Sequence, residues 1–128
     1  MTIRIVQLGS PRKPREGLRI GTVRRPPRGV RKEDWASRDF YDVWLPDLSP
    51  SATLVKSALA GSDERAWKAF ARDYRREMAR PEPQRLLTLL AALSHTADFS
   101  VGCYCEDEAR CHRSLLRELL AAHGAKLD

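Results

Sequence analysis

Three short stretches of the chain have apolar patterns that are typical of β-strands: the first two are short apolar segments, and the third alternates with period two. The stretches cover residues 3–8, 18–23 and 98–105. Glycine and proline bound the first two stretches, and residues 11–16 between them hold basic side chains and two prolines. The pattern therefore predicts two early strands joined by a basic loop, and one late strand.

A periodicity close to 3.6 residues predicts four helices in the rest of the chain. Ser49, with Pro50 after it, is the expected N-cap of the first helix, and Ser62 is the expected start of the second. Cys111 lies near the N-cap of the last helix, which we expect to end at Gly124. The helices are expected at residues 50–61, 62–79, 84–94 and 112–123.

Helices that lie between early and late strands favour an α/β fold with a mainly parallel sheet flanked by helices, because long connections permit crossovers. The length of 128 residues leaves room for one domain, so we expect residues 1–128 to form a single α/β domain. No apolar stretch approaches the roughly 20 residues of a membrane helix, and the N-terminus does not resemble a secretory signal. We therefore expect a cytoplasmic protein without membrane contact, and the oligomeric state stays open.

The formal net charge of +6 is distributed unevenly. Residues 1–32, the basic segment, hold ten basic side chains against Glu16 alone, a formal charge of +9, and the remaining residues carry −3. Such a segment is expected to attract an anionic partner. The partner could be nucleic acid, with Tyr41, Trp44 and Tyr104 stacking on bases if they are exposed, although the named recognition motifs are missing.

The segment CYCEDEARCHRS, residues 103–114, links the last strand to the last helix. In parallel α/β sheets, ligands bind beyond the carboxyl ends of the strands, where helix N-termini present free N–H groups. Arginine side chains hold phosphate or carboxylate groups in a bidentate manner, so we expect a pocket for a phosphate or another anionic small molecule. The alternative is that these arginines pair with nearby acidic residues on a solvated surface. The residues expected to bind the anion are Arg24, Arg25, Arg28, Arg113 and Ser114.

The three cysteines all lie between residues 103 and 111, which excludes a disulfide framework spread over the chain. A thiol at a helix N-terminus beside arginine and histidine is favoured as a thiolate, so Cys111 or Cys105 is a candidate nucleophile. Glu106 and His112 are the candidate acid and base. Adjacent residues point apart on a helix, however, so we expect His112 to be badly placed to activate Cys111.

A metal site is a further alternative. Cys103, Cys105, Cys111 and His112 are ligand types that suit zinc, and residues two apart on a strand share a face. Their spacing is not that of a standard zinc ribbon or finger, and the adjacent Cys111 and His112 would have to converge on one ion. The main expectation is therefore that no metal or cofactor is bound and that Cys103 is a buried core thiol.

Several separated motifs agree with one known family. GLRIGTVRRPPRGV, YDVWLPDLSPS, a helix with Trp, Phe and Tyr, and CYCEDEARCHRSLLRELL follow one another and span nearly the whole chain. In these motifs the chain resembles the bacterial domain-of-unknown-function 488 family. The resemblance implies a compact α/β fold and no particular activity, so whether the protein is an enzyme stays open. It also implies a site at Arg24, Arg25, Arg28, Cys105, Glu106, Cys111, His112 and Arg113.

Overall fold

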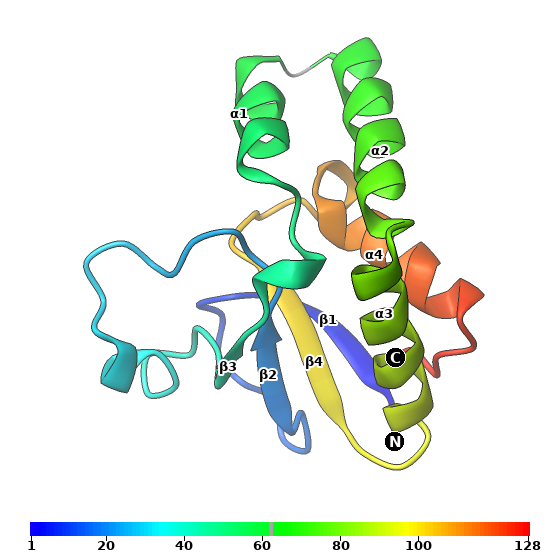
Figure 1. Ribbon diagram of the computed structural model, residues 1–128. Coiled ribbons are helices and arrows are strands. Elements are labelled where there is room, and N and C mark those ends of the chain that lie inside the picture. The colour runs from blue at the N-terminus through cyan, green and yellow to red at the C-terminus, as the bar shows by residue number, and fades with distance from the viewer. Residues whose placement is uncertain (62) are drawn as a thin grey trace.

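Four parallel strands form one sheet in the order β1–β4–β2–β3 (Figure 1). The computed structural model describes residues 1–61 and 63–128, so the expected helix start at Ser62 lies outside the described residues. The strands are β1 (Ile3–Gln7), β2 (Leu18–Gly21), β3 (Val43–Trp44) and β4 (Phe99–Cys103). The predicted α/β class with a mainly parallel sheet is confirmed.

Four helices accompany the sheet: α1 (Ala52–Ala60), α2 (Glu64–Met78), α3 (Pro81–Leu93) and α4 (His112–Ala122). The first three connect β3 to β4, and α4 follows β4. Figure 1 shows α1 and α2 as an upright pair that projects beyond the carboxyl ends of β2 and β4. In the part of the chain that the structure describes, every helix is too short or too polar to cross a bilayer.

Two helix starts differ from the predicted positions. Ser51, and not Ser49, is the N-cap of α1, because its hydroxyl accepts a hydrogen bond from the Leu54 N–H at 3.2 Å. The Ser49 hydroxyl is buried and donates instead to the Pro46 carbonyl at 2.8 Å. Helix α3 begins at Pro81, earlier than predicted, because a proline at the first helical position lacks only an N–H that would have no partner there.

The helix-covered face of the sheet carries the main apolar core. β4 is one of the two inner strands, and all five of its residues are buried. Phe99 and Val101 of β4 are in register with Ile3 and Ile5 of β1, and alternate residues of a strand share a face. These side chains belong to one core cluster with the following residues of α3 and α4: Leu87, Leu90, Leu115, Leu116 and Leu120.

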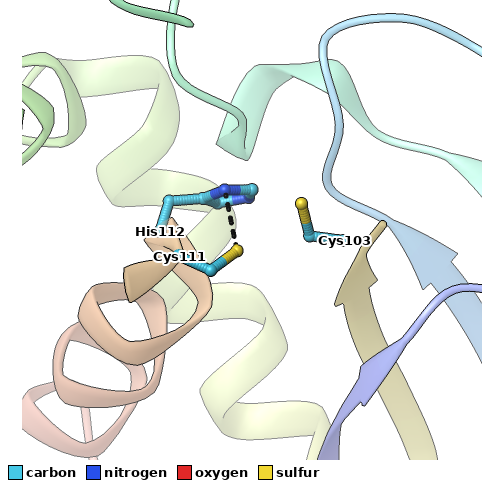
Figure 2. Close-up of side chains that lie close together, drawn as sticks. All are labelled: Cys103, Cys111 and His112. Atoms are coloured by element: carbon cyan, nitrogen blue, oxygen red, sulfur yellow. Dashed lines mark hydrogen bonds between the residues drawn. The ribbon is translucent and has the colours of Figure 1, made fainter. Parts of the chain in front are cut away.

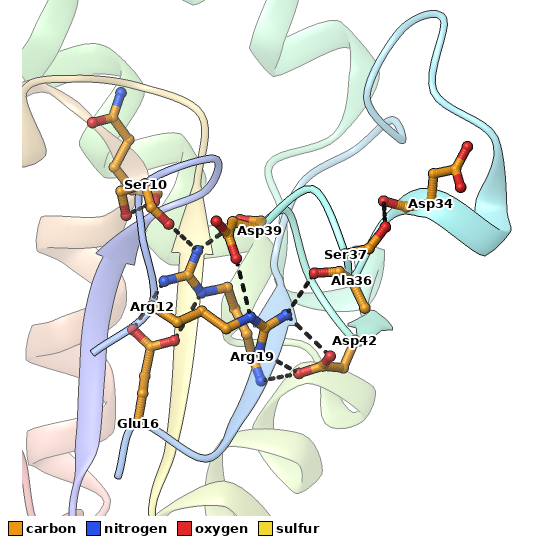
Figure 3. Close-up of polar contacts among 10 residues, drawn as sticks. Ser10, Arg12, Glu16, Arg19, Asp34, Ala36, Ser37, Asp39 and Asp42 are labelled. Carbon is orange, nitrogen blue, oxygen red and sulfur yellow. Dashed lines mark hydrogen bonds and ion pairs between the residues drawn. The ribbon is translucent and has the colours of Figure 1, made fainter. Parts of the chain in front are cut away.

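A buried ion pair lies on the sheet face opposite that of Ile20, the next residue of β2 (Figure 3). Arg19 is fully buried, and its Nε and Nη2 atoms donate to the two carboxylate oxygens of Glu16, both at 2.9 Å. Its Nη1 atom donates to the carbonyl oxygens of Ser10 at 2.9 Å and Asp39 at 2.7 Å. One guanidinium therefore fastens the β1–β2 connection and the loop before β3 to the sheet.

Asp42 extends this network at the protein surface. Its carboxylate accepts the Arg19 backbone N–H at 2.8 Å and a bidentate pair from Arg12 at 2.8 and 3.0 Å. Arg12 and Arg19 are thus occupied by intramolecular partners, and the positive charge that the basic segment presents to solvent is smaller than its composition implies.

Replacement of Arg19 by methionine is expected to lower the free energy of unfolding by about 3–5 kcal/mol, because Glu16, which is 2% exposed, would remain buried without its cation. Urea unfolding measures the loss. Arg4→Met is the matched control: Arg4 lies on the neighbouring strand β1 and approaches Asp128 only at 3.6 Å, so we expect a change within about 0.5 kcal/mol. Equal losses in the two variants would contradict a special role for the buried pair.

The stability of the protein is also expected to decrease as the pH is lowered through the acidic range. Burial opposes ionisation of Asp42, but the hydrogen bonds from Arg12 and the Arg19 backbone outweigh it and hold the pKa of this carboxyl below its ordinary value of 3.8. A lowered folded-state pKa stabilises the protein above the unfolded-state pKa, and this contribution is lost as the pH falls through the folded-state value.

Asp42→Asn is therefore expected to be less stable than the native protein at neutral pH and to lose less additional stability below about pH 4. Urea midpoints measured across this pH range test the expectation. Asp47→Asn, at an exposed position in the next turn, should instead follow the native curve.

Candidate functional site

A pocket of about 1160 Å³ opens at the carboxyl edge of the sheet, beside the α1–α2 pair. Its wall is built by segments that are distant in the sequence, so it exists only in the folded chain. The residues that follow β2 and those that follow β4 line the same pocket. The lining comes from residues 23–28, Phe40, several positions in 50–61 and 63–70, residues 103–105 and residues 110–112.

Basic side chains dominate the charged part of the lining. Arg25 and Arg28 are exposed, and within residues 1–61 and 63–128 their guanidinium groups form no ion pair or hydrogen bond. Lys56 of α1 also faces the pocket. Arg110 pairs with Glu64 at 2.6 Å and lies over the ring of Trp67, 5.8 Å from its centroid.

Arg24 has a different role from its two neighbours. Its Nε atom donates to the Pro50 carbonyl at 3.0 Å, and its Nη2 atom donates to the carbonyls of Pro46 at 3.1 Å and Ser49 at 3.4 Å. The side chain lines the pocket, but these bonds commit its donors to the turn that precedes α1. Arg24 therefore shapes the pocket wall.

Arg113 and Ser114 are not among the pocket-lining residues. Arg113 is 3% exposed and donates through Nη2 to the Cys105 carbonyl, whereas its Nε atom finds no partner in the described residues. The Ser114 hydroxyl donates to the Cys111 carbonyl at 3.0 Å. Both side chains hold the turn between β4 and α4 in place, and the helix start presents Cys111 and His112 to the pocket.

The three cysteines converge at this turn. Cys103 ends β4 and is buried, Cys111 is the buried N-cap residue of α4, and Cys105 is exposed between them. The Cys103 and Cys105 sulfurs are 3.6 Å apart. Figure 2 shows Cys103 facing Cys111 and His112 across the gap between strand and helix. All of them line the pocket.

His112 lies close to Cys111, so the expectation that the two side chains point apart is wrong. The Cys111 sulfur is 3.7 Å from His112 Nδ1 (Figure 2). The reason is backbone geometry: Cys111 has extended dihedral angles, φ −124° and ψ 153°, and so lies outside the helix that His112 begins. The spacing of side chains around a helix does not apply to its N-cap residue.

The imidazole of His112 has a defined orientation. Its Nε2 atom is 2.7 Å from the Thr22 carbonyl oxygen, which can only accept a hydrogen bond. Nε2 therefore carries the hydrogen, and the lone pair of Nδ1 points toward the thiols. Burial lowers the pKa of His112 to about 4, so the ring is neutral at pH 7.

The thiols affect one another strongly. The hydrogen bond from Cys103, together with one from Cys111, lowers the pKa of Cys105, and the same bond to Cys105 raises the pKa of Cys103. For Cys111, the bond with Cys103 favours the thiolate, but the bond with Cys105 and burial outweigh it and raise the pKa. The exposed Cys105 sulfur is thus the position in the cluster where negative charge is most stable.

Glu106, the other candidate for proton transfer, is exposed and does not line the pocket. Conversely, sequence reasoning missed Lys56, Trp67 and Arg110. Lys56 is the one charged residue of α1, which could have marked a pocket-facing position. Nothing in the sequence indicated that the Thr22 carbonyl orients His112, because a backbone group leaves no trace in side-chain identity.

The model of a known family matches most of the chain. The model of the active DUF488-N3 subclade, DUF488-N3a, matches residues 3–124. This range includes the strands, the helices and every pocket-lining residue. No curated protein and no solved structure matches the chain.

Removal of the Arg113 guanidinium is expected to loosen the turn that carries the cysteines. Arg113→Met leaves the Cys105 carbonyl without its donor, so we expect faster amide hydrogen exchange across residues 104–111 and a stability loss of about 1–3 kcal/mol. Exchange measured by mass spectrometry tests this. Arg85→Met, at an exposed position of α3, is the control and should leave the exchange of this turn unchanged.

Proposed function

The chain belongs to the DUF488 family, and from the residues around its pocket we propose that it binds a phosphate-bearing small molecule at the carboxyl edge of the sheet. Arg25 and Arg28 are the proposed phosphate ligands, with Lys56 and Arg110 adding positive charge to the pocket lining. A cytoplasmic location is part of the proposal.

The observation that carries the proposal is the pair Arg25 and Arg28. Most other arginines near the pocket have intramolecular partners: Arg24 binds three carbonyls, Arg110 binds Glu64, and Arg113 binds the Cys105 carbonyl. Among residues 1–61 and 63–128, Arg25 and Arg28 find no partner for their guanidinium donors, and both side chains line a concave surface. Guanidinium groups in such a position are suited to bidentate contact with phosphate oxygens.

The rest of the lining supports a ligand with an apolar or aromatic part. Phe40, Trp67, Phe70 and Tyr104 line the pocket together with prolines and aliphatic side chains of α1. Tyr104 also donates its hydroxyl to the Arg25 carbonyl at 3.0 Å, which ties the arginine-bearing loop to the residues after β4. A phosphate ester of a planar group matches this combination of basic and aromatic surface.

Two alternatives stay open. The first is an enzyme that uses Cys111, His112 or Glu106 on a phosphate-bearing substrate; it is favoured by the position of Cys111 and His112 in the pocket and by the description of the matched family as active. The second is a nucleic-acid accessory protein that uses the basic segment.

Trp67 lies in the pocket and allows binding to be followed by its fluorescence. We expect adenosine monophosphate to bind more tightly than adenosine. The double variant Arg25→Gln with Arg28→Gln should bind the monophosphate tenfold or more weakly, because a hydrogen bond to a charged group typically contributes about 1.5–3 kcal/mol. Arg31→Gln with Arg85→Gln removes the same charge at exposed positions outside the pocket lining and should leave the affinity unchanged.

Equal affinity for adenosine and its monophosphate, or native affinity in the Arg25 and Arg28 double variant, would overturn the proposal. A single-stranded oligonucleotide assayed in the same way distinguishes the accessory-protein alternative. Arg31 belongs to the basic segment and lies outside the pocket lining, so if the segment as a whole binds the oligonucleotide, Arg31→Gln alone should lower its affinity about as much as Arg28→Gln alone does. Product analysis of the adenosine monophosphate mixture tests the enzyme alternative.

A further inference from the structure

We infer that Cys103, Cys105, Cys111 and His112 form a binding site for a zinc ion at the inner end of the pocket. The two buried sulfurs of Cys103 and Cys111 and a ring nitrogen of His112 all lie within 4.8 Å of one another. The Cys105 sulfur lies 3.6 Å from that of Cys103, on the side that faces solvent. This inference is independent of phosphate binding, because it involves none of the proposed phosphate ligands.

The donor atoms of Cys103, Cys111 and His112 lie close enough together for one tetrahedral ion, and the Cys105 sulfur, which lies outside that group but next to Cys103, would complete the set by moving toward the ion. Zinc–sulfur bonds of about 2.3 Å place neighbouring sulfurs about 3.8 Å apart, and a zinc–nitrogen bond of about 2.0 Å makes the sulfur–nitrogen edge slightly shorter. The observed separations are 3.6 Å between the Cys103 and Cys105 sulfurs and 3.7 Å between the Cys111 sulfur and His112 Nδ1. Three thiolates with one imidazole are a donor set that favours zinc over calcium or magnesium.

The surroundings orient the imidazole as a ligand. A histidine that binds a metal through one nitrogen usually donates the hydrogen on its other nitrogen to a carbonyl or carboxylate, which fixes the ring. His112 does this toward the Thr22 carbonyl at 2.7 Å, and its Nδ1 lone pair faces the sulfurs. The Thr22 backbone is itself held, since its N–H and hydroxyl both donate to the Gly102 carbonyl, at 3.0 and 2.9 Å.

Arg113 is the positive partner for the charge that the site would carry with zinc bound. Zinc binds thiolates, so the three thiol protons pass to solvent and the complex carries a net charge of about −1. A buried charge requires an opposite charge nearby. Arg113 is 3% exposed, donates through Nη2 to the Cys105 carbonyl, and keeps one buried nitrogen, Nε, without a partner among residues 1–61 and 63–128. The ion would fasten the end of β4 to the start of α4.

Cobalt(II) reports this geometry directly. Metal-free, reduced protein prepared without a histidine tag is titrated with Co²⁺ and then with Zn²⁺, in the absence of phosphate. We expect the visible d–d bands of tetrahedral Co²⁺ and a thiolate charge-transfer band that saturate at about one ion per chain and disappear when Zn²⁺ displaces the cobalt. Folded protein that gives no tetrahedral spectrum would overturn the inference.

Substitutions test which side chains bind the metal ion. Cys105→Ser changes an exposed side chain, so the fold should persist, and loss of one thiolate in three should lower the charge-transfer intensity by about a third and weaken binding by tenfold or more. A native spectrum and affinity in this variant would overturn the four-ligand site. His95→Gln, an exposed histidine after α3, is the control and should match the native protein.

Discussion

Hydrogen bonding of β4 to a parallel neighbour on each side is the constraint on which the pocket depends. Its register with β2 pairs Gly102 with Gly21, so the two chains leave the sheet side by side. The Thr22 carbonyl then reaches His112, and the Tyr104 hydroxyl reaches the Arg25 carbonyl. The cysteines, which follow β4, and the arginine-bearing loop that follows β2 face one pocket because β4 and β2 end side by side.

The apolar pattern of the sequence predicts β1, β2, β4 and the four α-helices, because the periodic positions, such as Val101 and Leu116, are the ones that become buried. It does not predict β3, because a strand of two residues is too short to show a period. The carboxyl edge could be located from the order of elements. The orientation of individual groups could not be predicted, because it depends on the backbone. Cys111 lies close to His112 because Cys111 is an N-cap residue with an extended backbone. Arg24 donates to backbone carbonyl oxygens, which every sequence has.

Different sets of interactions stabilise the two faces of the sheet. Helices α3 and α4 cover one face with leucine side chains, whose burial is nondirectional. Loops cover the other face and are held by the donors of Arg19, which require specific acceptors at specific angles. The loop before β3 also contributes Trp35, Phe40 and Tyr41 to a second apolar cluster, so the Arg19 hydrogen bonds add a defined position to a loop that apolar contacts hold as well.

The position of β4 also determines when the sheet can form during synthesis. β1 and β2 do not pair with each other, and β1 is joined to the β2–β3 pair only through β4, about four-fifths of the way along the chain. A nascent chain that has emerged as far as α3 therefore contains three strands and lacks the one that unites β1 with β2. Because these pairings are so distant in sequence, assembly of the sheet is a late and comparatively slow event in the folding of a small protein.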